Sequence, residues 1–140
     1  FLVDPGVMGA IWGASSSDVL TDIDLVGRLL ETFVVAQVRA EAALLPVPPR
    51  LHHLRTAEGR REIDLVIEVG PRRLVAIEIK ATATPSDADA RHLRWLRESL
   101  GEASVTTVLL HTGPMAFKLS DGTLAAPVAA LWEGGGRRQA

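Results

Sequence analysis

The fold is decided by residues 61–81, REIDLVIEVGPRRLVAIEIKA, in which apolar side chains alternate with polar or charged ones. Alternation with a period of two is typical of a β-strand whose two faces have different surroundings. The dipeptide Gly70-Pro71 interrupts the alternation and is a turn signal. The stretch therefore predicts a β-hairpin with one strand on each side of the turn.

The alternation also predicts which side chains share a face of this hairpin. A turn centred near Pro71 places Asp64 opposite Glu78 and Glu62 opposite Lys80. On the first strand, one face is expected to hold Ile63, Leu65, Ile67 and Val69, and the other Glu62, Asp64, Val66 and Glu68. On the second strand, the corresponding sets are Val75, Ile77 and Ile79, and Leu74, Ala76, Glu78 and Lys80.

The pairing of Asp64 with Glu78 is unfavourable unless a cation lies between them. Directly opposite residues have Cβ atoms ~4.5–5.5 Å apart, and two carboxylates that close repel by about 4 kcal/mol at an effective dielectric of about 20. A divalent cation removes this repulsion, because carboxylate ligands of Mg²⁺, at ~2.0–2.1 Å, can come from both strands. Lys80 follows ~6.6 Å along the face, where it can meet a water or a phosphate oxygen.

Asp64, thirteen intervening residues and then Glu78-Ile79-Lys80 form a pattern that resembles the D…(D/E)-x-K signature of the PD-(D/E)XK nuclease superfamily. Further motifs occur in one order along the chain: Gly27-x-x-x-Glu31-x-Phe33-Val34, His53-x-Arg55, Glu62-Ile63-Asp64-Leu65-Val66-Ile67, Ile77-Glu78-Ile79-Lys80, Leu109-Leu110-His111-Thr112-Gly113 and Pro127-x-x-x-Leu131-Trp132. Together they are similar to the C-terminal nuclease-like domain of prokaryotic AAA-type ATPases, a domain of unknown function. The resemblance covers nearly the whole chain.

This resemblance implies an α/β fold, with a restriction-endonuclease-like α-β-β-β-α-β core and a mixed central sheet. We expect residues 1–133 to form a single domain and residues 134–140 a flexible tail. The start at Phe1 and the resemblance suggest the C-terminal fragment of a longer ATPase. No Gly-x-x-x-x-Gly-Lys-Ser/Thr phosphate loop occurs, so no ATP site is expected in this fragment.

Composition bounds the function further. The chain has 140 residues, of which 47% are hydrophobic and 23% charged, as in globular domains. The absence of cysteine excludes disulfides and thiolate metal sites. No apolar run approaches the ~18 residues of a membrane span, and no signal peptide is indicated, so we expect a cytoplasmic protein that does not contact membranes. A net charge of −2 argues against non-specific coating of nucleic acid.

Around the hairpin, a long helix is expected from about Asp22 or Asp24 to Leu45, with Glu31 at the edge of its apolar stripe. A strand is expected at Leu51–Thr56, and a helix capped by Ser86 with Asp87 and Asp89 in its first turn. The remaining expected elements are a strand at Phe1–Val3, a helix to Trp12, a buried stripe of Leu93, Leu96 and Leu100, a parallel strand at Val105–Leu110, a strand at Met115–Leu119 and a helix at Pro127–Trp132.

The resemblance also implies roles for individual residues. Asp64 and Glu78, joined by Glu31, are expected to bind Mg²⁺ or Mn²⁺, and Lys80 to stabilise the charge that develops at a scissile phosphate. Asp64, Glu78 and Lys80 are thus the expected catalytic residues. Arg55 and Arg61 are the expected contacts to DNA, the expected partner of the site. The four histidines lack zinc-site spacing and are interpreted as surface residues.

Three readings of this site stay open at the level of sequence. The first is a Mg²⁺-dependent nuclease that hydrolyses DNA phosphodiesters. The second is a catalytically inactive module that binds nucleic acid or a protein and regulates the attached ATPase. In the third, Glu62 and Lys80 form a cross-strand ion pair, worth ~0.2–1 kcal/mol, and the carboxylates face water. Substrate specificity and oligomeric state are not determined by the sequence.

Overall fold

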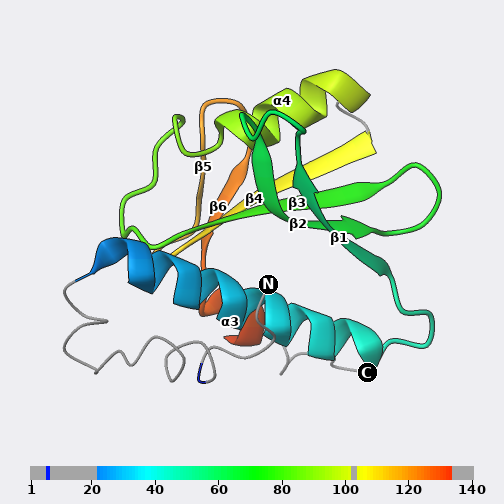
Figure 1. Cartoon of the computed structure of the whole chain (residues 1–140), viewed down its shortest axis with the longest axis horizontal. Coiled ribbons are helices and arrows are strands. Elements are labelled where there is room, and N and C mark those ends of the chain that lie inside the picture. Colours follow the sequence, from blue (N-terminus) through cyan, green and yellow to red (C-terminus); the bar gives the residue numbers. More distant parts are fainter. Residues whose placement is uncertain (1–5, 7–21, 102–103, 134–140) are drawn as a thin grey trace.

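A single mixed sheet of six strands, with the order β1-β2-β3-β4-β6-β5, organises the domain. It is seen in a computed structural model that describes residues 6, 22–101 and 104–133. Helix α3 lies along one face of the sheet and α4 along the other (Figure 1). The elements are α3 (Ile23–Ala43), β1 (Arg50–Arg55), β2 (Glu62–Glu68), β3 (Leu74–Lys80), α4 (Arg91–Leu100), β4 (Val105–His111), β5 (Phe117–Lys118), β6 (Leu124–Pro127) and α5 (Ala130–Glu133).

Helix α3 forms where the sequence predicts it. The carboxylate of Asp22 caps its first turn and accepts hydrogen bonds from the backbone N–H groups of Asp24 and Leu25, at 3.0 and 3.1 Å. The helix ends at Ala43, before the proline-rich segment 46–49. Its buried face, which includes Val34, packs on the β-sheet residues Leu65, Ile77, Ile79 and Leu110.

The central hairpin has the predicted register. Strands β2 and β3 pair antiparallel from Glu68–Leu74 to Leu65–Ile77. The next step along this ladder would place Asp64 opposite Glu78, as predicted. Gly70 supports the turn between the strands with a φ of +94°, a conformation that residues with a side chain rarely adopt.

The predicted strict alternation along β2 is wrong near Asp64. The pairing of β1 with β2 shifts register between His52–Val66 and Leu54–Ile63, which is a β-bulge. As a result, Ile63 and Val66 lie in one core cluster with Leu93 of α4, whereas Leu65 lies in the other cluster, against α3. On β3 the predicted faces are confirmed: Ile77 and its neighbours of the same parity face α3, and Ala76 faces α4.

The second half of the sheet is parallel to β3. Strand β4 pairs parallel with β3 after the α4 crossover, as predicted, and β6 pairs parallel with β4. The order α3-β1-β2-β3-α4-β4 therefore matches the expected α-β-β-β-α-β sequence of elements. The predicted helix from Pro127 to Trp132 is wrong at its start, because Leu124–Pro127 is strand β6 and the helix α5 covers only Ala130–Glu133.

Helix α4 begins later than predicted, at Arg91 instead of after Ser86. Asp89 accepts hydrogen bonds from the N–H and hydroxyl of Ser86, at 2.8 and 2.9 Å, so it closes a loop. Asp87 accepts from the N–H and hydroxyl of Ser120, at 3.0 and 2.7 Å. Both carboxylates therefore hold the loop in place and do not cap the helix. Leu93 and Leu96 are buried, but Leu100 is 50% exposed, so the predicted stripe is shorter.

The strand and helix predicted between Phe1 and Trp12, and the tail predicted at residues 134–140, lie outside the described residues apart from Gly6. Among the helices that the structure describes, none combines the length and apolar character needed to cross a membrane.

Candidate active site between β2 and β3

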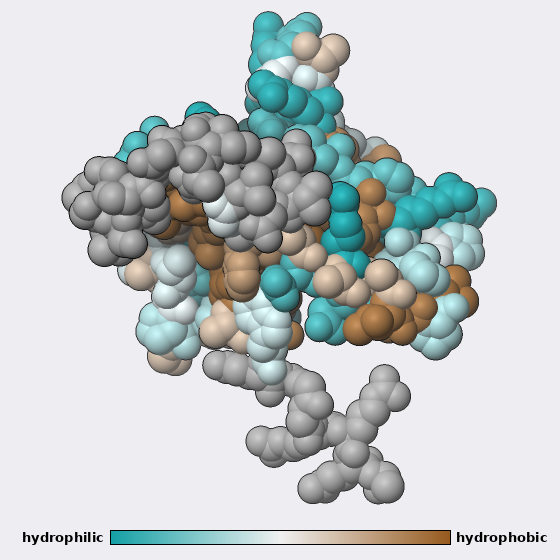
Figure 2. Space-filling model, turned by 60° about the horizontal axis from the view of Figure 1, so that its bottom comes forward, coloured by the Kyte–Doolittle hydropathy of each residue, from teal (hydrophilic) through white to brown (hydrophobic). Residues whose placement is uncertain are grey.

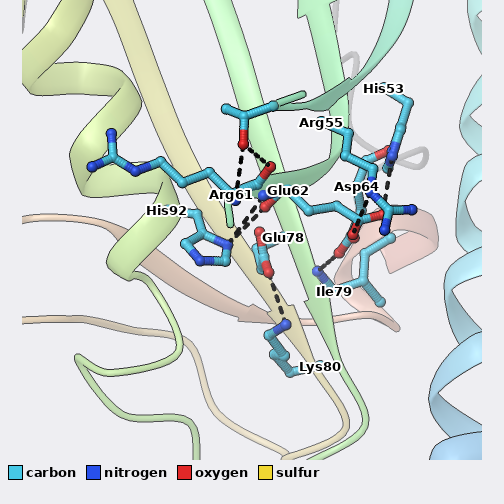
Figure 3. A network of polar contacts seen from close by, with 10 residues as sticks. His53, Arg55, Arg61, Glu62, Asp64, Glu78, Ile79, Lys80 and His92 are labelled. Atoms are coloured by element: carbon cyan, nitrogen blue, oxygen red, sulfur yellow. Dashed lines mark hydrogen bonds and ion pairs between the residues drawn. The ribbon is translucent and has the colours of Figure 1, made fainter. Parts of the chain in front are cut away.

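The structure brings the four predicted site residues toward one end of the central hairpin. Asp64 comes from β2, Glu78 and Lys80 from β3, and Glu31 from α3. Figure 3 shows Asp64, Glu78 and Lys80 along the adjacent strands, with the Lys80 side chain turned toward Glu78. Asp64 lies close enough to influence the ionisation of Glu31, Glu78 and Lys80. The carboxylates and the lysine thus form one electrostatically coupled group.

Asp64 is placed by a hydrogen bond between its side chain and the backbone, at the point where the bulge interrupts the alternation of β2. Its Oδ2 atom accepts a hydrogen bond of 2.7 Å from the backbone N–H of Ile79 (Figure 3). Regular pairing of β2 with β3 ends at Leu65–Ile77. If the pairing continued, a backbone carbonyl of β2 would accept the hydrogen bond from the Ile79 N–H; here the Asp64 carboxylate accepts it instead. Because the N–H groups of a strand lie in the plane of the sheet and point toward the neighbouring strand, the carboxylate lies between β2 and β3, beside the bulge.

Glu78 is the most deeply buried carboxylate of the group, with 4% of the residue exposed. Its Oε1 atom accepts a hydrogen bond of 2.7 Å from Nζ of Lys80. Its Oε2 atom is buried and has no hydrogen-bond partner within the described part of the chain. Burial raises the pKa of Glu78 to about 7, and the negative charge of Asp64 adds to this effect against the opposing influence of Lys80.

Glu31 faces the same region from α3. Burial raises its pKa to about 7, with further contributions from Asp64 and Glu62. A cleft of about 480 Å³ separates the first half of α3 from the end of β3. The residues that line the cleft are Ile23, Asp24, Gly27, Arg28, Glu31, Asp64, Ile79, Lys80, Ala81, Thr82 and Asp89. Glu31, Asp64 and Lys80 therefore border this space. Glu78 does not line it, but it accepts a hydrogen bond from Lys80, which does.

The chemistry of these residues fits a divalent cation such as Mg²⁺. Carboxylate oxygens are its usual protein ligands. Burial raises the pKa of Asp64, although the hydrogen bond from the Ile79 N–H acts to lower it. The Oε2 atom of Glu78, which no donor of the described residues reaches, is an acceptor of the kind that ligates such a cation. Over residues 22–101 and 104–133, however, no three His, Asp or Glu side chains are already gathered as a set of metal ligands.

The ion pair between Glu62 and Lys80, expected if the site were purely structural, is not formed. Glu62 instead contacts Nε2 of His53 at 3.1 Å and Nε of Arg55 at 3.9 Å. Lys80 pairs with Glu78 on its own strand. The bulge explains the difference, since it shifts the start of β2 relative to its neighbours.

The two predicted DNA contacts lie at the same end of β2. The side chain of Arg55 is 64% exposed, and its ion pair with Glu62 among the described residues is long, at 3.9 Å. Arg61 stacks its guanidinium over the ring of Trp95 in α4, 4.3 Å from the ring centroid. Trp95 in turn packs against the core cluster that includes Leu93 and Leu96. Both arginines flank Glu62 in Figure 3, so the border of the site carries positive charge.

His111 belongs to this region, although the sequence does not indicate it. The predicted surface position is wrong, because His111 is 1% exposed, at the position on β4 that pairs with Lys80. Its Nδ1 atom accepts a hydrogen bond of 2.9 Å from the N–H of Gly113, and a Cβ atom at Gly113 would collide with the carbonyl oxygen of Ala83. The signal available in the sequence was its position at the end of a near-continuous apolar strand.

The fold and the site define a class: a mixed α/β domain with an acidic cleft and one lysine at the end of its central hairpin. The profile of a family described as a domain of unknown function, DUF4143, matches residues 26–131, and the chain belongs to this family. Such domains are commonly found in AAA-ATPase-associated proteins. Searches of curated proteins and of solved structures gave no significant match.

Proposed function

We propose that this domain is a divalent-metal-dependent phosphodiesterase that acts on DNA, on a restriction-endonuclease-like core. The observation that carries the proposal is the buried carboxylate of Glu78, which has one hydrogen-bond donor and one unpartnered oxygen within the described part of the chain. An acceptor left without a partner in the interior costs ~1–3 kcal/mol, and more when it is charged. A sheet built only for stability has no use for this arrangement, whereas a cation site does.

Asp64, Glu78 and Glu31 are the residues that would hold Mg²⁺ or Mn²⁺, which when bound would lower the pKa of a coordinated water and polarise a phosphate. The protein supplies the positions. The Ile79 amide orients Asp64, and burial among β-strands fixes Glu78. Lys80 is 36% exposed and lines the cleft, so its ammonium is placed to stabilise negative charge on a phosphate that enters there.

DNA is the proposed substrate because phosphodiester backbones are bound by exposed arginines. Arg55 and Arg61 supply positive charge beside the acidic residues. The net charge of −2 gives the isolated domain little long-range attraction for DNA. We therefore propose that an attached ATPase delivers the substrate, in keeping with the proteins in which such domains are commonly found.

The test measures metal binding and cleavage in the same set of proteins. We expect Mn²⁺ at a hundredfold excess over Kd to stabilise the wild type by ~2.7 kcal/mol in urea unfolding. The double variant Asp64→Asn, Glu78→Gln should lose this stabilisation. The variant Glu98→Gln, which changes an exposed glutamate of α4, is the control for a general charge effect.

Cleavage is measured as nicking of supercoiled DNA at low salt, with Mn²⁺ present. We expect slow nicking by the wild type and loss of nicking in Lys80→Ala, while Mn²⁺ still binds this variant. If Lys80→Ala nicks DNA as fast as the wild type, the lysine has no role in the reaction. If no nicking occurs even with the ATPase portion attached, a regulatory binding module replaces the nuclease as the better reading of this site.

A further inference from the structure

Lys80 occupies a position among carboxylates that a divalent cation would also favour. We propose that its ammonium group takes the place of the cation in the metal-free protein, and that a metal ion binds by displacing Lys80 from Glu78. This inference rests on the metal site proposed above and goes beyond it. It gives Lys80 a second role, as the competitor that sets how tightly the site binds metal.

The contacts of Lys80 support this role. Its Nζ atom lies 2.7 Å from Oε1 of Glu78, a charge-assisted hydrogen bond at the short end of the usual range. The negative charges of Asp64 and Asp89 also act on this ammonium. The ammonium is therefore held directly by Glu78, one of the carboxylates that would ligate a metal.

An ammonium and a divalent ion on the same carboxylate repel each other strongly. Their repulsion is twice that of two monovalent cations at equal separation, and it is poorly screened where Glu78 is buried. Asp64 is electrostatically coupled to Glu31 and to Glu78, but no three ligands are gathered among the described residues. We expect the ammonium bonded to Glu78 to oppose the convergence of these carboxylates on an ion.

Lys80 has a place to go when it leaves Glu78. Its side chain is 36% exposed, in contrast to 5% for the side chain of Glu78. It also lines the cleft of about 480 Å³ on the α3 side of the hairpin. Displacement would move the ammonium toward this space, where the proposed phosphate would bind. Loading the metal and placing the lysine would then be a single event.

The test compares Mn²⁺ affinities, measured by electron paramagnetic resonance, for the wild type, Lys80→Met and Arg91→Met. Arg91 is the matched control: it is exposed and its charge reaches Glu78, but no contact joins the two residues. We expect Lys80→Met to bind Mn²⁺ at least tenfold more tightly than the wild type. Arg91→Met should stay within about threefold of the wild type, because it removes a charge without freeing the carboxylate.

Three outcomes separate this inference from the proposed function. Tighter binding by Lys80→Met alone supports the exchange. Equal or weaker binding by Lys80→Met, or the same gain in Arg91→Met, overturns it and leaves the metal site standing. If neither the wild type nor Lys80→Met binds Mn²⁺ in a manner that Glu78→Gln abolishes, the metal site itself is wrong and the exchange falls with it.

A second measurement follows Lys80 directly in the wild-type protein, so it needs no variant. The chain has two lysines, Lys80 and Lys118, and Lys118 lies on the exposed strand β5 as an internal reference. Acetylation of each lysine is timed by mass spectrometry with and without saturating Mg²⁺. We expect Mg²⁺ to speed the labelling of Lys80 several-fold and to leave Lys118 unchanged. Unchanged or slower labelling of Lys80 would mean that the ion binds beside the lysine without displacing it.

Discussion

The side chains of Asp121 and Glu78 are both largely buried but have different partners, and the difference separates a structural network from a candidate active site. Asp121, in the turn between β5 and β6, has partners on both oxygens: the N–H of Thr123 at 2.9 Å, and Nε of Arg94 and Nη2 of Arg97 at 3.4 and 3.5 Å. Among the described residues, Glu78 has one partner, Lys80, and its second carboxylate oxygen has none.

The ionisation of the two carboxylates follows their partners. Burial acts to raise the pKa of Asp121, but the hydrogen bonds from Thr123 and Arg94 and the charge of Arg97 outweigh it and lower the pKa. Burial of Glu78 is not offset, and its pKa rises to about 7. The partners of Asp121 therefore outweigh the effect of its burial, whereas those of Glu78 among the described residues do not. Removing each carboxylate should have opposite effects on stability.

The largest expected effect comes from Asp121. Asp121→Ala leaves Arg97, whose side chain is 14% exposed, without its counter-charge, and breaking a buried pair costs up to about 3–5 kcal/mol. We expect that loss in the free energy of unfolding measured with urea. Glu98→Ala, on the exposed side of the same helix that carries Arg97, should change it little. A loss below about 1 kcal/mol in Asp121→Ala would show that the network is not what holds the β5–β6 turn to α4.

The effect at Glu78 should have the opposite sign. Glu78→Gln removes a carboxylate whose ionised form is disfavoured in the fold, since its pKa rises from the usual 4.5 to about 7. Each unit is worth about 1.4 kcal/mol, and loss of the Lys80 contact offsets part of the gain, so we expect a net stabilisation of about 1–2 kcal/mol. Urea unfolding at about pH 8 with a chelator present tests this. A destabilised variant would make Glu78 a structural residue like Asp121.

The pH dependence of stability should reflect the ionisation of Glu31 and Glu78. Between about pH 4.5 and 7, folded Glu31 and Glu78 keep protons that they release in the unfolded chain. The free energy of unfolding of the metal-free protein should therefore fall as the pH rises through this window. The slope should be smaller in Glu31→Gln and in Glu78→Gln, and smallest in the double variant. An unchanged slope in both single variants would mean that neither group is perturbed.

Some of the site was predictable from sequence because it depends on local pattern. The hairpin register follows from the period of two and the turn at Gly70-Pro71, and it was correct. The parallel strand β4 follows from its continuous apolar run, and it was also correct. By contrast, β6 is a strand of four residues, Leu124–Pro127, whose extended form depends on pairing with β4. No local signal in that segment predicts a strand.

The partners of the charged residues depend on the bulge in β2, which alternation alone does not reveal. The bulge moves Glu62 toward His53 and Arg55, so Lys80 pairs with Glu78 and not with Glu62. It also sets Asp64 between the strands, where the Ile79 amide holds it. The residues of the site could thus be named from the sequence, but their bonds required the three-dimensional structure.

The smallest expected effects on stability are at the two arginines that border the site. Arg55 is exposed and loosely paired, so Arg55→Ala should leave the free energy of unfolding within about 0.5 kcal/mol of the wild type. Arg61→Ala should cost more, about 0.5–1 kcal/mol, because it removes the stack on Trp95.

The same two variants test the proposed DNA contacts. If Arg55 and Arg61 both contact phosphates, each variant should reduce the slope of log affinity for DNA against log salt concentration by about 1. Fluorescence anisotropy with a labelled duplex at several salt concentrations measures that slope. A change in Arg61→Ala alone would confine the DNA contact to the side of the site next to α4, and no change in either would remove both arginines from the proposed interface.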